Sequence, residues 1–360
     1  YKFSPDLLVS HNGSSGNLEY IFGASAKQGE HIEHRLDKDY TPAGDFFAQS
    51  GRKTDNVFKT LKFNSNLTYN MDNGDEFRLN GQFEPAIYDK YEPRFTEDLN
   101  QPEQLQYWKE DQKSQKWEIG GDYTSKIGSL GVWKTLFIAN RDRIDKQSTY
   151  DNVFDSGNIP IFRNDQYRVK QEKIIRSSLN LNITNKQILE VGVEAAFNKF
   201  SKKFTQESFA DNAFTLSSND DVAVNEKRYE FFANHTYNIS SKMVLQSSLV
   251  AEFSKISSVT VPLIGANIER SKNFKFLKPR VDLRYDLTGN DQIRATVERK
   301  VSQLDFQNFV AKYDISLDKV RLGNTGIVPE KSWNYNLTYE HRLPNDAGSI
   351  QAEFFYRDIS

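Results

Sequence analysis

The clearest pattern in the sequence is an alternation of apolar and polar residues. Between Leu61 and Met71 the odd-numbered positions carry Leu, Phe, Ser, Leu, Tyr and Met, whereas the even-numbered positions carry Lys, Asn, Asn, Thr and Asn. Successive side chains of a β-strand point to opposite faces, so this segment predicts a strand with one apolar face and one polar face.

The same alternation recurs at 76–84, 179–184, 280–287 and 333–340, and is less regular at 132–140. Fourteen strands are predicted, at approximately 5–12, 17–27, 57–71, 76–88, 114–127, 131–148, 170–184, 188–204, 223–239, 243–259, 272–288, 292–305, 332–343 and 349–358. Several are about twice as long as the roughly 5–6 residues of an average soluble strand. They match the roughly 9–11 tilted residues that cross a bilayer, with additional length in solvent.

The predicted connections differ in length on the two sides of the sheet. Clusters of Gly, Asn, Asp and Ser predict short turns near 13–16, 72–75, 128–131, 185–187, 240–242, 289–291 and 344–348. Long polar loops are expected near 28–56, 89–113, 149–169, 205–222, 260–271 and 306–331. Outer-membrane β-barrels have this asymmetry, with short periplasmic turns and long external loops.

Composition narrows the choice of fold class. The chain has 37% hydrophobic residues and a mean hydropathy of -0.69, and no run approaches the roughly 20 apolar residues of a helical span. A barrel strand faces lipid with only every second residue, so this polarity is compatible with a membrane β-barrel. An aromatic content of 13% argues against bulk disorder. The expected fold is all-β: a transmembrane antiparallel up-and-down β-barrel.

Charge and cysteine content exclude several kinds of site. The 47 basic and 49 acidic residues leave a net charge of -2, which gives no electrostatic case for nucleic-acid binding. The chain has no cysteine, which excludes disulfides and thiolate metal sites.

The last third of the chain carries a recognisable order of motifs. A strand at 277–285 (LKPRVDLRY) turns at Gly289-Asn290-Asp291 and returns as QIRATV at 292–297. Gly323-Asn324, PEKSWNYNL at 329–337 and FFYRDI at 354–359 follow. This order resembles the barrel of TonB-dependent outer-membrane receptors.

The resemblance implies active transport across a bacterial outer membrane. The family barrel has 22 strands, and about 14 strands are predicted in residues 1–360. An open sheet edge in lipid costs several kcal/mol for each unpaired backbone group. The 14 strands are therefore expected to be part of a larger barrel. The implied partners are outer-membrane lipid, an N-terminal plug domain, the TonB energy-coupling complex and a small nutrient such as a metal chelate, vitamin, glycan or peptide. No enzyme activity or cofactor is implied.

Other functions stay open at this point. A passive porin-like channel and a barrel that serves as an adhesion scaffold would share the same strand pattern. An outer-membrane hydrolase would need a Ser/His pair at one rim, and no catalytic constellation is identified among the five histidines. A soluble multi-sheet protein would have to explain the long strands and the sorting of loop lengths.

Two groups of residues are candidates for ligand contact. Tyr88, Tyr91, Tyr107 and Trp108 are expected in a long loop, where aromatic rings either stack on a ligand or form the outer interfacial girdle. The second group is expected to face the lumen, as part of a ligand path or as a solvated wall: Arg78, Arg280, Arg284, Arg294, Glu298 and Lys300.

The sequence predicts no metal site. His31 and His34 lie three residues apart in an expected loop without a third ligand, and solvated histidines are the simpler interpretation. The segment Ser217–Asp221 offers oxygen ligands for Ca²⁺ but lacks the spaced acidic pattern and the terminal Glu of a dedicated calcium loop.

Overall fold

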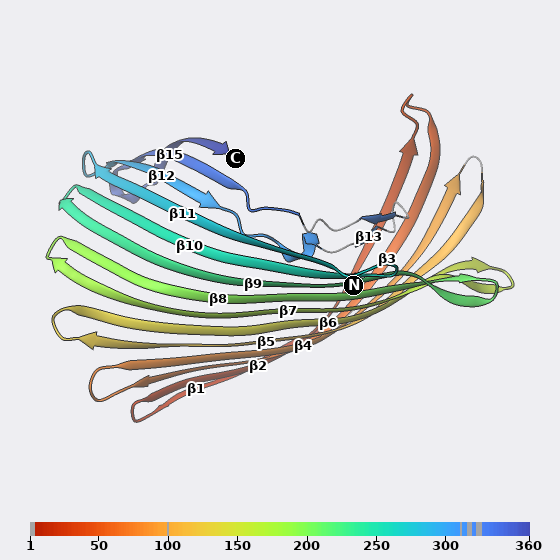
Figure 1. The fold of residues 1–360 in the computed structure, drawn as a ribbon, viewed down its shortest axis with the longest axis horizontal. Coiled ribbons are helices and arrows are strands. Elements are labelled where there is room, and N and C mark those ends of the chain that lie inside the picture. The colour runs from red at the N-terminus through yellow and green to blue at the C-terminus, as the bar shows by residue number, and fades with distance from the viewer. Residues whose placement is uncertain (1–3, 99–100, 310–311, 315–318, 322–325) are drawn as a thin grey trace.

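The computed structural model describes residues 4–98, 101–309, 312–314, 319–321 and 326–360. Fourteen antiparallel strands form one sheet (Figure 1), in the order β1 to β12, then β15 and β16. The strands are β1 (Asp6–Ser15), β2 (Leu18–Tyr40), β3 (Phe46–Asn70), β4 (Glu76–Asp98), β5 (Gln101–Ile127), β6 (Gly131–Phe154), β7 (Gly157–Thr184), β8 (Gln187–Ala210), β9 (Ala213–Ser240), β10 (Met243–Pro262), β11 (Ile268–Asp286), β12 (Asp291–Val301), β15 (Lys331–Arg342) and β16 (Ser349–Ile359).

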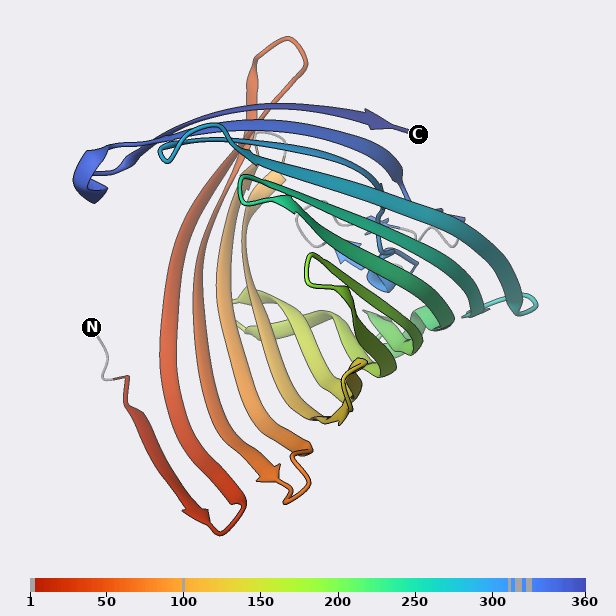
Figure 2. The same cartoon turned by 90° about the vertical axis from the view of Figure 1, so that its left-hand side faces the viewer.

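The expected all-β, up-and-down architecture with fourteen strands is confirmed. Neighbours in the sheet are consecutive along the chain, except that β12 pairs with β15. Two short strands between them, β13 (Lys312–Asp314) and β14 (Lys319–Arg321), form a separate pair. The sheet curves into a trough that is not closed, with β1 and β16 as its two borders (Figure 2). Among the described residues, no helix is long and apolar enough to cross a membrane.

Most of the expected long loops are strand in the structure. The connection expected at 28–56 is reduced to 41–45, because β2 and β3 stay paired as far as Tyr40 and Phe46. The loops expected at 89–113, 149–169, 205–222 and 260–271 are likewise largely strand, and only the connection after β12 stays long. In these outer halves polar residues lie on both faces and apolar residues also occur on the concave one, so the simple alternation fades while the backbone pairing continues.

Tight turns join the strands at the other end of the sheet. Gly16 (φ 57) and Gly74 (φ 86) adopt the left-handed conformation that favours glycine. In the second turn the Met71 carbonyl accepts a hydrogen bond from the Gly74 amide at 2.9 Å. The ends that carry these turns are called the turn ends of the strands below, and the opposite ends are the outer ends.

A band of aromatic side chains lies close to the turn ends on one face of the sheet. Tyr69 is opposite Phe77, which is itself opposite Tyr123 on the next strand. Further along the sheet, Tyr285 pairs with Ile293, which pairs with Tyr339. Rings at this level are typical of the interfacial girdle of a membrane β-barrel.

The polar face of the sheet is the concave one. The described residues directly after β12 lie inside the trough in Figure 2. Leu304, Phe306 and Ile327 pack against an apolar cluster on the sheet. The buried residues of that cluster are Phe200, Val222, Val224 and Ile256. We call the face that carries this cluster the concave wall, and the face with the aromatic band the convex wall.

Candidate functional site

Three arginines stand side by side on the concave wall near the outer ends of β2, β3 and β4. Arg35 is directly opposite Arg52, and Arg52 is directly opposite Arg94. We call these three residues the arginine row. Their placement depends on strand register alone, since the three residues are far apart in the sequence.

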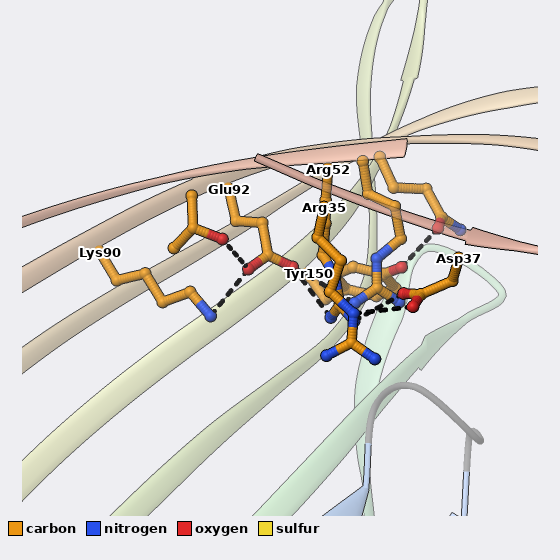
Figure 3. A network of polar contacts seen from close by, with 9 residues as sticks. Arg35, Asp37, Arg52, Lys90, Glu92 and Tyr150 are labelled. Atoms are coloured by element: carbon orange, nitrogen blue, oxygen red, sulfur yellow. Dashed lines mark hydrogen bonds and ion pairs between the residues drawn. The ribbon is translucent and has the colours of Figure 1, made fainter. Parts of the chain in front are cut away.

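Two acidic residues hold this row in place. Asp37 contacts Arg35 at 2.7 Å and Arg52 at 2.8 Å. Glu92, of which 2% is exposed, contacts Lys90 at 2.9 Å, Arg94 at 3.2 Å and Arg52 at 4.0 Å. Figure 3 shows Glu92 between Lys90 and the arginines, with Arg35 and Arg52 both directed at Asp37.

Both carboxylates are kept ionised by their surroundings. Glu92 is 16 residues from the start of β4, about 50 Å along the strand at roughly 3.3 Å per residue, and so lies outside the roughly 25 Å apolar band. Burial disfavours its charge, but hydrogen bonds from Lys90 and Thr54 and the charge of Arg94 outweigh burial and lower the pKa of Glu92. At Asp37 burial also disfavours the charged form. The hydrogen bonds and the positive charges of Arg35 and Arg52 outweigh it, and they lower the pKa of Asp37.

Aromatic rings continue the wall next to the arginine row. Glu92 is opposite Trp108, Trp108 is opposite Tyr150, and Tyr150 is opposite Phe162. The Lys90 ammonium lies 4.1 Å from the centroid of the Trp108 ring, and the Tyr150 and Phe162 rings are 5.1 Å apart. We call Trp108, Tyr150 and Phe162 the aromatic row.

The four aromatic candidates from the sequence do not form one site. Trp108 and Tyr88 lie on the concave wall, where Tyr88 donates a hydrogen bond to Asn56. Tyr91 and Tyr107 lie on the convex wall, with ring centroids 5.4 Å apart. All four belong to strands β4 and β5, not to the loop that the sequence suggested. Their contact with a ligand stays a prediction.

A second charged row crosses the concave wall closer to its centre. Glu194, Glu230 and Glu252 are directly opposite one another on β8, β9 and β10. Lys278 lies 2.8 Å from both Glu230 and Glu252, and Arg228 lies 3.3 Å from Glu194. We call the three acidic residues the glutamate row. Arg176 contacts Glu194 at 3.8 Å and Glu190 at 3.5 Å, so three cations lie among four carboxylates.

The six candidates expected to face the lumen all lie on the concave wall. Arg280 is opposite Glu298, and Arg284 is opposite Arg294. Contacts within this set are close, since Arg280 is 3.2 Å from Glu298 and Lys300 is 2.8 Å from the same carboxylate. Arg78 is separate from the others, on β4, and pairs with Glu76 at 2.7 Å. Whether these residues line a ligand path stays a prediction.

The histidine pair and the acidic segment both lie on strands, not in loops. His31 and His34 are an odd number of residues apart on β2, so their side chains point to opposite walls. The residues Ser217–Asp221 belong to β9. Within the described part of the chain, no group of three His, Cys, Asp or Glu residues could hold a metal ion.

The arginine row, the glutamate row and the apolar cluster around Phe200 were not predicted from the sequence. For the aromatic candidates, the sequence does show which positions must lie on opposite faces of a strand. Tyr88 and Tyr91 differ by an odd number of residues, and this difference places them on opposite faces of any regular strand.

The sequence matches a family model along nearly its whole length. The model is described as "TonB dependent receptor-like, beta-barrel" and matches residues 11–360. No curated protein matches the sequence.

Solved structures of outer-membrane receptors share the fold. The siderophore receptor PiuA from Acinetobacter baumannii is similar with a TM-score of 0.61 at 10% identity, covering 98% of this chain and 56% of that one. The copper transporter OprC has a TM-score of 0.56 at 12% identity, covering 99% and 53%. The ferric-catecholate import receptor Fiu from E. coli K12, in its closed form, has a TM-score of 0.52 at 9% identity, covering 98% and 58%. The chain therefore spans little more than half the length of these structures.

Proposed function

Because the chain belongs to the family of TonB-dependent receptor β-barrels, we propose that it forms the wall of an active-transport receptor in a bacterial outer membrane. The receptor binds a scarce nutrient from outside the cell and imports it with energy from the TonB complex. The observation that carries this proposal is the family match over residues 11–360.

The geometry of the sheet supports this proposal. The convex wall is apolar with an aromatic band near the turn ends, as a lipid-facing surface requires. The concave wall carries ionic and aromatic side chains toward its outer ends, where a ligand from outside arrives first. The strands of 19 to 28 residues from β2 to β11 are longer than the roughly 9–11 needed to cross a bilayer, so they hold these side chains above the membrane.

The other parts of the machine are part of the proposal. The chain covers 53% to 58% of the length of the similar receptors, so a plug domain and further strands would come from the remainder of the protein. PiuA is named a siderophore receptor and OprC a copper transporter. For this protein the nutrient class is a metal chelate, vitamin, glycan or peptide.

Uptake in living cells tests the proposal. A strain that lacks the gene should grow more slowly when one scarce nutrient limits growth, and the full-length gene should restore growth. Removal of TonB should abolish this rescue. A passive channel, the alternative function, would restore growth without TonB and would lose its effect only at low external concentration.

Two controls separate the remaining alternatives. An adhesion scaffold would change surface binding and leave the uptake of every nutrient unchanged. A hydrolase would release product outside cells that carry the receptor but lack TonB. Either result would reject the transport function.

A further inference from the structure

Five neighbouring strands, β7 to β11, each place an exposed lysine on the convex wall at a similar level. Phe197 on β8 is directly opposite both Lys173 and Lys227, and Lys227 is in turn opposite Lys255. The other two lysines lie two residues to either side of this row. We call the five residues the lysine belt: Lys173, Lys199, Lys227, Lys255 and Lys275.

The belt marks the end of the apolar surface of the convex wall. Lys227 is ten residues from Tyr237 on β9, and Lys275 is ten residues from Tyr285 on β11, where every convex position between them is apolar. Such a distance is about 33 Å along a strand and about 25 Å along the membrane normal at a tilt of roughly 40°, which is the height of the apolar band. In the proposed membrane placement, the belt lies at the outer edge of the hydrocarbon, at the level of the lipid headgroups.

The lysine belt has no acidic partner on its own wall. None of its members forms an ion pair with any of the described residues. On β7 to β11 the convex acidic residues closest along a strand are Asp221, six residues from Lys227, and Glu269, six residues from Lys275. Glu226 is next to Lys227 in the sequence, but it points to the concave wall, where it is buried. The belt is therefore a positive strip that no carboxylate of these strands contacts.

This arrangement is unfavourable without a counter-charge. Lys227 and Lys255 are directly opposite each other, and like charges in opposed positions of neighbouring strands destabilise a sheet. On the concave wall the same sheet pairs its lysine, because Lys278 lies 2.8 Å from both Glu230 and Glu252. A negative group on the convex wall would offset the repulsion, and the compact ammonium group of lysine is a common binder of phosphate.

Exposed aromatic rings accompany the lysines. Phe197, Tyr229 and Phe253 are 40% to 44% exposed, and the ring centroids of Phe197 and Tyr229 are 6.1 Å apart. A soluble anion would leave these rings in water. A lipid would cover them with its acyl chains, while the lysine side chains extend along the apolar wall and hold their ammonium groups at the headgroups.

We propose that the lysine belt binds the phosphate groups of a lipid in the outer leaflet, with the acyl chains of that lipid on the apolar wall below. Five strands at a spacing of roughly 4.8 Å extend the belt over about 19 Å, so a headgroup with two phosphates fits it better than a headgroup with one. The inference goes beyond the transport function. It depends on the placement of the convex wall in the membrane, and not on TonB or on the nutrient.

Native mass spectrometry of the full-length receptor in detergent tests the inference. The probe is lipid A, an acylated glucosamine disaccharide with two phosphates. The comparison lipids are the same disaccharide lipid with both phosphates removed, and phosphatidylethanolamine, which has no net charge. Lipid A should bind to the unmodified receptor, and the two comparison lipids should stay at the level of nonspecific attachment.

Matched variants separate charge from structural support. The double variant Lys227→Gln/Lys255→Gln should weaken lipid A binding by about 25-fold, or about 5-fold for each charge removed. Lys227→Arg/Lys255→Arg should retain the affinity. Without lipid, the glutamine variant should be at least as stable to heat as the unmodified receptor, because the repulsion is removed. Lys203→Gln is the control, since Lys203 lies on the same wall but pairs with Asp221 at 3.5 Å, and this variant should bind lipid A like the unmodified receptor.

Four outcomes would overturn the inference. They are unchanged affinity in the double glutamine variant, equal binding of the lipid without phosphates, complete displacement of lipid A by millimolar pyrophosphate, and lower heat stability of the glutamine variant without lipid. The third would indicate a site for soluble anions, and the fourth a structural role of the lysines. The transport function is decided separately, since uptake that is independent of TonB would reject that function while lipid binding by the purified receptor would still decide the role of the belt.

Discussion

Phe232 lies across Gly192, the residue directly opposite it on the neighbouring strand, so closely that a Cβ on the glycine would be 2.3 Å from the ring. The Arg176 guanidinium lies 4.0 Å from the centroid of the same ring. The pairs Gly29–Phe58 and Gly13–Tyr20 repeat the arrangement. In each pair the missing side chain of a strand glycine makes room for an aromatic ring.

Gly192→Ala should therefore destabilise the receptor. The added methyl group would also be 2.6 Å from the Ser177 carbonyl oxygen, a backbone atom held by strand pairing. Overpacking of this kind costs about 1–3 kcal/mol, and urea unfolding of the full-length protein in detergent measures it. Gly51→Ala is the control, because a Cβ there has no atom within 4 Å. Equal stability of the two variants would contradict the packing argument.

The convex wall should contact lipid and the concave wall should not. Single cysteines at Phe63 and Leu67 should react with a lipid-soluble maleimide in membranes, whereas cysteines at Asn64 and Asn66 should react with a water-soluble one. The four positions follow one another on β3, and Phe63 pairs with Phe83 while Asn64 pairs with Gln82. Equal labelling of both sets would show that the assigned faces are wrong.

The outer ends of the strands should be accessible from outside the cell. Cysteines at Glu33 and Asp111 should react with an impermeant reagent on whole cells. A cysteine at Asn73, in the turn between β3 and β4, should react only after the outer membrane is opened. The opposite result would reverse the orientation of the barrel.

Lys278 should be important for stability, because it lies between two carboxylates of the glutamate row. Lys278→Met would leave Glu230 and Glu252 partly buried next to each other. Breaking a buried ion pair costs about 3–5 kcal/mol. This range is an upper value for Lys278, because the site is partly solvated. Lys203→Met is the control, since the Lys203–Asp221 pair is exposed and worth about 0–1 kcal/mol. Thermal unfolding of both variants decides between a structural network and a solvated surface.

The ion network around Asp37 should resist acid. A carboxylate whose pKa is lowered by folding contributes stability that is present above its unfolded pKa and lost as the pH falls through its folded pKa. Cleavage at the tip 41–45 should therefore be slow between about pH 7 and 5 and should accelerate below about pH 4. Limited proteolysis with pepsin measures the low-pH range, with Asp37→Asn as the control that lacks this change. A transition near pH 6 would instead indicate a histidine.

The turn-end halves of the strands were predictable because one face is apolar and the other polar, so the two residue types alternate along each strand. In β3 this half carries the pattern from Leu61 to Met71, and the turn that follows contains Gly74 at a positive φ. In the outer half of β2 the concave face is polar throughout, whereas the convex face mixes Ile32 and Leu36 with His34 and Lys38. The contrast between the faces is therefore weak there, and the pairing with β3 shows that the segment is a strand.

The arginine row could not be predicted for a related reason. The opposition of Arg35, Arg52 and Arg94 depends on where two chain reversals fall, and a shift of a single residue would separate these side chains. The predicted lengths of the outer loops were wrong by many residues. The side-chain chemistry was visible in the sequence, but the register that brings it together was not.

The continuation of strands through the outer half of the wall limits how this protein can diverge in evolution. A single residue inserted between Gln28 and Tyr40 would turn every side chain beyond it to the other wall and would exchange concave positions for convex ones. Insertions and deletions should therefore accumulate at the strand tips or occur in pairs. New specificities would then arise mainly by substitution at fixed positions of the wall, and length variation should be concentrated in the connection between β12 and β15.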